Sequence, residues 1–201
     1  MTDSGTPRRS TGVEILDRVF DGGIPAGSVV SICASPDSQS HLLVTATAEA
    51  NPTTYFSTYR PPSAVDADAD VKSRDVTQLA EDPPRLAASV PQDGAVVVDR
   101  LNEIESLGTE TLGEALNALA AACAERDAVA LLHCLGEEER PERSLSLSRS
   151  DLVVHLVRTV TSLSIDHRLV VTKFRGGRAP TEPVKVKLTD HVAVDTSRDI
   201  A

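Results

Sequence analysis

Aromatic residues are almost missing from this sequence of 201 residues, which has no tryptophan, three phenylalanines and two tyrosines. The core must therefore be built from valine, leucine, isoleucine and alanine. Hydrophobic residues make up 40% of the chain, which excludes intrinsic disorder for most of it. No apolar run approaches the roughly 18 residues that a membrane span needs, and none follows the basic pair near the N-terminus. These absences predict one cytoplasmic domain over residues 1–201, with residues 1–9 flexible.

Lysine is also rare, with four residues against 16 arginines, while 17 of the 30 acidic residues are aspartate. The net charge is -10 and the isoelectric point is near 4.9. Such a surface is typical of a halophilic protein, because salt at 1 M screens its self-repulsion beyond about 3 Å. The same charge repels nucleic acid and anionic membranes, so the composition favours protein or small-molecule partners.

Short β-branched runs alternate with longer helical patterns, which is typical of a parallel sheet covered by helices. Strands are predicted over residues 28–34, 53–58, 94–99 and 128–135. Leucines at helical spacing predict helices over 38–50 and 109–126. The clearest strand, GAVVVD, ends in Asp99, and an acid at the C-terminal end of a central strand is expected to face a site.

The rest of the chain is less regular. Residues 61–85 are acidic and punctuated by proline, which predicts a weakly ordered loop region with a short strand near 71–76 and a helix from Pro83. The charged run 137–142 is expected to be a solvated loop. After about residue 151 the pattern alternates as in antiparallel strands. The predicted fold is α/β, with a mostly parallel central sheet, helices on both faces and an antiparallel C-terminal edge.

The segment STGVEILDRVFDGGIPAGSVV, residues 10–30, resembles the opening of RecA-superfamily ATPases of the KaiC-like type. Those proteins begin with a similar STG, a Leu-Asp pair, a GGIP and a glycine before the first core strand. The matching residues here are Gly12, Leu16, Asp17, Gly22, Gly23, Ile24, Pro25 and Gly27. The closing segment 169–195 is similar to the family's last strands and its Lys-x-Arg-Gly turn. The resemblance spans nearly the whole chain and implies a RecA-like P-loop NTPase fold.

The nucleotide loop of that family reads GxxxxGK[ST], in which backbone N–H groups and lysine hold the phosphates and the hydroxyl holds Mg²⁺. The corresponding residues are Ala34, Ser35, Pro36, Asp37, Ser38, Gln39, Ser40 and His41. Both glycines, the lysine and the hydroxyl are replaced, and Asp37 adds a carboxylate where phosphate would lie. This degenerate Walker A loop predicts loss of anion binding. The side chains of Gln39, His41 and Tyr59 are expected to fill the vacated pocket.

Of the family's other functional positions, the acidic pair is replaced, whereas the Walker B-like acid and the Lys-x-Arg pair are retained. Tyr59 and Arg60 stand where the family carries an acidic pair, so no general base remains there. Asp99 matches the Walker B-like acid and is expected to cap the sheet by hydrogen bonds rather than to bind metal. Lys173 and Arg175 match a pair that reaches the neighbouring subunit's nucleotide in ring-forming relatives. The resemblance implies that this pair acts on a neighbouring subunit's nucleotide or at an interface, which requires both cations to be exposed and free of carboxylate partners. The alternative is that they are an exposed basic pair with no such role.

The three cysteines, Cys33, Cys123 and Cys134, are odd in number and lack CxxC spacing, which argues against a disulfide framework or a zinc site. The RecA-type sheet order would place Cys33 beside Cys134 at the C-terminal rim of the sheet. Reduced, packed thiols are predicted, with a redox or metal role as the alternative.

Together these features predict a pseudo-ATPase that has no catalytic residues, cofactor or metal and acts as a regulatory or scaffolding subunit. Its expected partners are proteins, including an active KaiC-like or RecA-like homologue in a homo- or hetero-oligomer. One alternative is an ATP-binding ATPase with an unorthodox loop, which would need ATP and Mg²⁺. The other is a DNA recombination or repair paralogue, for which Arg8, Arg9, Arg175 and Arg178 are the only local basic excess and few aromatics could stack on bases.

Overall fold

The computed structural model describes residues 5–65, 69–72, 76–136 and 140–194 of the chain. Its strands are β1 (Arg8–Arg9), β2 (Ile24–Pro25), β3 (Val29–Ala34), β4 (Thr53–Ser57), β5 (Asp70–Lys72), β6 (Ala95–Asp99), β7 (Val129–Leu135), β8 (Leu152–Val160), β9 (Ile165–Phe174), β10 (Val184–Leu188) and β11 (Val192–Val194). Its α-helices are α1 (Glu14–Val19), α2 (His41–Glu49), α3 (Val76–Ala80), α4 (Pro83–Ala88), α5 (Asn102–Glu105), α6 (Thr109–Glu125) and α7 (Pro141–Arg149), and a short 3-10 helix covers Pro62–Ala64.

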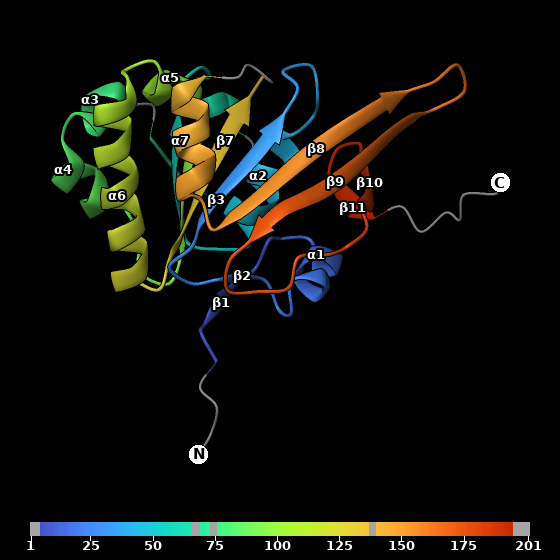
Figure 1. Ribbon diagram of the computed structural model, residues 1–201, viewed down its shortest axis with the longest axis horizontal. Helices are drawn as coiled ribbons and strands as arrows, with labels where there is room; N and C mark the ends of the chain where they lie inside the picture. The colour runs from blue at the N-terminus through green and yellow to red at the C-terminus, as the bar shows by residue number, and fades with distance from the viewer. Residues whose placement is uncertain (1–4, 66–68, 73–75, 137–139, 195–201) are drawn as a thin grey trace.

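One nine-stranded sheet organises the molecule, in the order β11-β10-β9-β8-β3-β7-β6-β4-β5 (Figure 1). The six strands β8, β3, β7, β6, β4 and β5 are each parallel to the next in this order. The pairs β8–β9, β9–β10 and β10–β11 are antiparallel. The predicted α/β fold, with its parallel centre and antiparallel C-terminal edge, is therefore confirmed. One detail was wrong: β8 is parallel to β3 and becomes antiparallel only toward β9, so the antiparallel part begins one strand later than expected.

Helices cover both faces of the sheet and create two apolar cores. Helices α3 to α7 pack on one face, where the largest buried side chains include Phe56 of β4, Leu86 of α4 and three leucines of α6. Helices α1 and α2 pack on the other face with β10. Every residue of β3, β4 and β6 is buried, which explains why β3 and β6 read as nearly continuous apolar runs rather than as alternating ones.

The residues that carry the family resemblance at the N-terminus hold the start of the chain against α2. The Asp17 carboxylate accepts hydrogen bonds from the Ser10 hydroxyl at 2.6 Å and from the Thr11 N–H and hydroxyl at 2.7 Å each. Gly12 has a φ of +76°, and a Cβ there would lie 2.0 Å from the Ala46 carbonyl oxygen. A side chain at this position would therefore separate the opening segment from α2.

Several expectations about order and helices need correction. Residues 8 and 9, expected to be flexible, form β1 against β2. In the region 61–85 the predicted helix from Pro83 is confirmed as α4, and the predicted short strand near 71–76 overlaps β5; helix α3, which buries Leu79 at 5% exposure, was not predicted. Helix α7 was not predicted at all. Residues 66–68, 73–75 and 137–139 of the predicted loops lie outside the described residues. In the described ranges no helix is long and apolar enough to cross a membrane.

Candidate functional site

The degenerate loop runs from the end of β3 to the start of α2 and folds onto itself. The Ser35 carbonyl accepts hydrogen bonds from the Ser38 N–H at 3.0 Å and the Ser38 hydroxyl at 2.6 Å. The Asp37 carboxylate is held by the Ser35 hydroxyl and by the guanidinium of Arg158 on β8. These contacts lower the pKa of Asp37, the Ser35 hydrogen bond having the largest effect. The loop therefore carries a fixed negative charge where a phosphate would need donors.

Beside this loop, a buried polar cluster forms around Asp99 at the end of β6. Asp99 has no exposed surface and pairs in register with His133 of β7. Its Oδ1 lies 2.6 Å from His133 Nδ1, and its Oδ2 accepts the Tyr55 hydroxyl at 2.6 Å and the Arg60 guanidinium at 3.2 Å. We call these five residues, with Ser40 as the fifth, the Asp99 cluster; Ser40 Oγ lies 2.8 Å from His133 Nε2.

Charge and burial compete at Asp99. Burial alone would raise the pKa of this carboxyl, but the hydrogen bonds from His133, Tyr55 and Arg60 outweigh it and lower the pKa. An ionised carboxylate only accepts hydrogen bonds, so His133 Nδ1 carries the proton and donates it. In a neutral imidazole Nε2 then accepts from the Ser40 hydroxyl. The same environment raises the pKa of Tyr55, first through burial and then through the nearby Asp99 charge.

The order Ser40–His133–Asp99 has the hydrogen-bond sequence of a serine hydrolase triad, with the serine immediately before a helix. Ser40 and His133 are each only 1% exposed, however, and Asp99 is not exposed at all. A substrate carbonyl cannot reach a nucleophile that is enclosed in this way. The arrangement therefore serves as a buried structural network that joins the start of α2 to β6 and β7.

The mouth of the cluster is basic. The Tyr59 ring, with the residue 42% exposed, lies under two guanidinium groups, with the carbon of Arg100 4.5 Å and that of Arg60 5.1 Å from the ring centroid. The imidazole of His41 is half-buried nearby, and its pKa is lowered first by burial and then by the charge of Arg60. These contacts place Arg60, rather than a general base, at the position where the resembled family carries its acidic pair.

The structure revises which side chains fill the vacated pocket. Tyr55, Arg60 and His133 occupy it together with the buried Ser40 hydroxyl. Gln39 was expected to fill it and does not: its exposed side chain lies against the Leu188 and Thr189 carbonyls, 3.0 and 3.1 Å from an amide nitrogen placed to donate. The reason is that the loop turns Gln39 toward the β10–β11 connection.

The carboxylate at the Walker B-like position is engaged by the protein's own side chains. Both oxygens of Asp99 already accept hydrogen bonds from protein donors, and the Arg60 guanidinium is one of these donors. Ser40 stands at the position of the family's lysine and points its hydroxyl into the cluster instead of toward a phosphate. Among the described residues no group of three or more His, Cys, Asp or Glu side chains is arranged to hold a metal ion.

Lys173 and Arg175 lie at the end of β9, where the trans-acting role would require both cations to be exposed and free of carboxylate partners. The Lys173 amine donates to the Leu147 and Ser148 carbonyls at 3.1 and 2.8 Å and so caps the C-terminus of α7. Arg175 pairs with Asp151 at 2.8 Å, although its side chain remains 65% exposed. Of the two, only Arg175 presents most of its side chain to solvent.

These observations define the class of the protein by its fold, an α/β domain with a RecA-like sheet in which Ser40, at the start of α2, is joined to Asp99 through His133. The model of a family of unknown function (DUF7125) matches residues 8–201, and the chain belongs to this family. None of the curated proteins compared with the chain matches it in sequence. Among solved structures, the KaiC-like protein PH0186 from the hyperthermophilic archaeon Pyrococcus horikoshii OT3 matches with a TM-score of 0.77. It shares 12% sequence identity, and the match covers 94% of this chain and 99% of that chain.

Proposed function

We propose that this protein is a non-hydrolysing member of the KaiC-like group that acts as a regulatory or scaffolding subunit through contacts with other proteins. The observation that carries the proposal is that both carboxylate oxygens of Asp99 are already bonded: Oδ1 contacts His133, and Oδ2 accepts hydrogen bonds from Tyr55 and Arg60. A carboxylate that is fully buried and bonded in this way cannot position Mg²⁺ without breaking the cluster.

ATP binding provides the direct test against the alternative of an unorthodox ATPase. In calorimetric titration with Mg²⁺ and ATP in buffers of molar KCl, we expect no saturable heat, because the loop offers Asp37 and no lysine to the phosphates. An intact-loop KaiC-like protein titrated under the same conditions is the positive control. Saturable binding at micromolar affinity would contradict the proposal and support the ATPase alternative.

The described structure gives the DNA-binding alternative little support. Arg8 donates to the Phe20 and Gly23 carbonyls, and Arg9 pairs with Asp93. Phe20 packs edge-on against Phe174, with ring centroids 5.2 Å apart, so neither ring is free to stack on a base. Arg8, Arg9, Phe20 and Phe174 are therefore committed to internal contacts and are not available to hold single-stranded DNA.

A surface suited to protein contacts lies at the tip of the β8–β9 hairpin, which projects beyond the rest of the domain in Figure 1. Leu163 at its turn is 95% exposed, and Val160 and Ile165 beside it are 61% and 62% exposed. Three large apolar side chains on one exposed hairpin are unusual on a highly charged protein and favour burial against a partner.

Replacing Leu163 and Ile165 with aspartate is expected to abolish capture of partner proteins from a native lysate at high salt, while the domain stays folded. These side chains are solvent-exposed, so the change in unfolding free energy is expected to stay within about 0.5 kcal/mol. The matched control is Thr159→Asp/Ser162→Asp, which adds the same two negative charges at exposed polar positions of the same hairpin and keeps its apolar side chains. Equal capture by the aspartate variant and the wild type would show that the tip is not the contact.

Arg175 is the candidate for a trans-acting role if the captured partner is an active ATPase. Adding the wild-type protein is expected to raise that partner's turnover, and Arg175→Ala is expected to lose the effect, because a cation supplied in trans stabilises phosphoryl transfer. Lys173→Ala should instead lower the stability of the protein itself by about 0.3–1 kcal/mol through loss of the α7 cap. Arg178→Ala is the control. Equal turnover with the wild type and Arg175→Ala would reject the role.

A further inference from the structure

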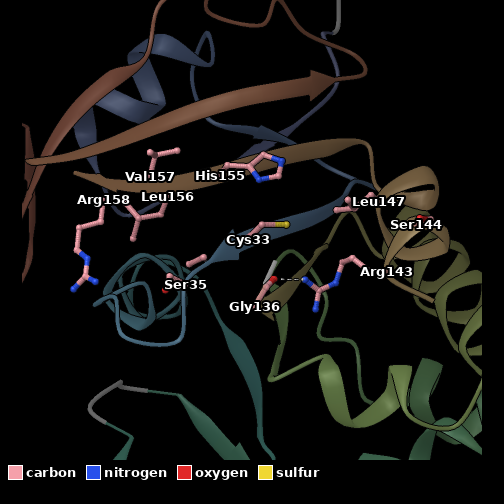
Figure 2. Close-up of a pocket in the computed structure, with 11 residues that line it drawn as sticks. Cys33, Ser35, Gly136, Arg143, Ser144, Leu147, His155, Leu156, Val157 and Arg158 are labelled. Atoms are coloured by element: carbon pink, nitrogen blue, oxygen red, sulfur yellow. Dashed lines mark hydrogen bonds between the residues drawn. The ribbon is translucent and has the colours of Figure 1, made fainter. Parts of the chain in front are cut away.

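A cavity of about 760 Å³ opens at the C-terminal ends of β3 and β8, beneath α7 (Figure 2). Its wall includes Ala34 and Ser35, the first two residues of the degenerate loop, but none of residues 36–41 and no member of the Asp99 cluster. Cys33 in this wall belongs to the core on the face covered by α6 and α7, whereas the alternation of side chains along β6 directs Asp99 to the face covered by α2. The Cys33 side of the cavity is therefore distinct from the Asp99 cluster.

Three side chains form a row across this face of the sheet. Cys33 on β3 pairs in register with His155 on β8 and with Cys134 on β7. Figure 2 shows the Cys33 sulfur and the His155 ring on the cavity side, with Arg143 of α7 across from them. Cys33 is 7% exposed and lines the cavity, while Cys134 has no exposed surface and lies behind it. The predicted proximity of Cys33 and Cys134 is confirmed.

The two thiols differ in ionisation. The neighbouring Cys134 thiol and the positive charge of Arg143 lower the pKa of Cys33, although burial opposes them. The same interaction between the two thiols, together with complete burial, raises the pKa of Cys134. Arg143 is fixed in this position by a bidentate pair with Glu105, at 2.8 and 2.9 Å. Cys33 lines the cavity and is therefore the thiol that an entering molecule can reach, whereas Cys134 is enclosed and its S–H lies 3.6 Å from the Leu132 carbonyl oxygen.

The spacing of the strands permits a bond between the two sulfurs. Neighbouring strands lie about 4.8 Å apart, and disulfides join Cα atoms about 4.4–6.8 Å apart. Because Cys33 and Cys134 are register partners with side chains on the same face, the backbone already brings them within this range. Arg143 and Arg158 bring positive charge to the wall, and the volume suffices for a small organic disulfide.

We propose that Cys33 is a reactive thiol that exchanges with low-molecular-weight disulfides entering this cavity, and that Cys134 resolves the adduct into a Cys33–Cys134 disulfide. The Cys33 thiolate attacks one sulfur of the small disulfide, a new S–S bond forms, and the other half leaves as a thiolate that takes a proton from water. The Cys134 sulfur then attacks Cys33, and the second half leaves with the Cys134 proton. Two protein thiols are oxidised and one small disulfide is reduced to two thiols.

The test uses the reduced full-length chain in molar KCl with dithiodipyridine, a neutral aromatic disulfide that releases a coloured thiopyridone. The wild type is expected to release two thiopyridones per chain, to retain no adduct and to lose two hydrogens in mass, with peptide mapping joining Cys33 to Cys134. Cys134→Ser is expected to release one and keep a pyridyl adduct on Cys33. Cys123→Ser, which changes a buried thiol of α6 outside the cavity, should behave as the wild type.

Cys33→Ser is expected to slow thiopyridone release by about tenfold or more, because the remaining thiols are enclosed. A misfolded variant would expose Cys123 and Cys134 and react faster, so slow release cannot result from unfolding. Release from Cys33→Ser as fast as from the wild type, or an adduct that persists on wild-type Cys33 without forming the disulfide, would overturn the proposal. The outcome does not depend on nucleotide or on a protein partner, so it is independent of the proposed function.

Discussion

Replacing Asp99 with alanine is expected to lower the free energy of unfolding by about 3–5 kcal/mol, which is the cost of removing one partner from a buried ion pair. The substitution strands the Arg60 guanidinium and leaves the Tyr55 hydroxyl and His133 Nδ1 without their acceptor. Urea unfolding in molar KCl, followed by circular dichroism, measures the loss. A metal-binding carboxylate with no structural bonds would give the opposite result, because its removal normally relieves repulsion.

Asp190→Ala is the matched control for this experiment. The Asp190 side chain is 87% exposed and contacts His191 and Thr189 at the surface, so its removal is expected to change stability by less than about 0.5 kcal/mol. If Asp99→Ala and Asp190→Ala have the same small effect, the Asp99 cluster does not stabilise the domain, and the proposed function loses its principal support.

Acid unfolding gives an independent measure of the same cluster. The pKa of Asp99 is below the ordinary value of 3.8, so its ionisation stabilises the folded state fully above that value. This stabilisation is lost as pH falls below 3.8 and through the lower folded pKa. Asp99→Asn cannot lose a charge, so its stability should depend less steeply on pH than that of the wild type in this range.

Arg143→Met is expected to lower the free energy of unfolding by about 3–5 kcal/mol, because it leaves the Glu105 carboxylate buried without its cation. Glu105 is 5% exposed at its side chain and Arg143 11%. Glu105 also accepts the Ser146 hydroxyl at 3.0 Å, so the pair joins α5 to the middle of α7. The double variant Glu105→Leu/Arg143→Met should recover most of the loss, since no charge then remains buried.

Arg149→Met is the control on the same helix. Arg149 is exposed and donates to Asn117 at 2.5 Å, so a change of less than about 0.5 kcal/mol is expected. A double variant as unstable as Arg143→Met would mean that the methionine disrupts packing rather than stranding a charge. The double-mutant cycle, measured by urea unfolding, separates these two causes.

The parallel centre of the sheet could be predicted because its strands are buried on both faces and therefore read as unbroken apolar runs. Helix α7 could not be predicted, because its sequence PERSLSLSR has few apolar residues and alternates in a way that suits a strand. Its stability comes from the Arg143–Glu105 pair, which joins residues 38 positions apart in the chain. Local propensity has no access to such a contact.

The candidate site shows the same division. The loss of the loop glycines and lysine is visible in the residues themselves, as is the retention of Asp99. The role of Arg60 is not, because a motif comparison records only that an acid is missing at this position. Its contact with Asp99 spans 39 residues and depends on β4 lying beside β6. Register pairing of β6 with β7 is the one signal that could have indicated His133 as a partner of Asp99.

The place of β3 in the sheet affects the order in which the chain can fold during synthesis. This first long strand lies between β7 and β8, so both of its edges stay unpaired until residues 129–156 are available. About 95 residues separate the end of β3 from the start of β7, which corresponds to roughly 5–20 s of ribosomal synthesis. During that interval the segment VVSICA exposes two open hydrogen-bonding edges and an apolar surface on each face. A nascent chain of this protein therefore has a long aggregation-sensitive period, and shielding by a chaperone would matter most before β7 emerges.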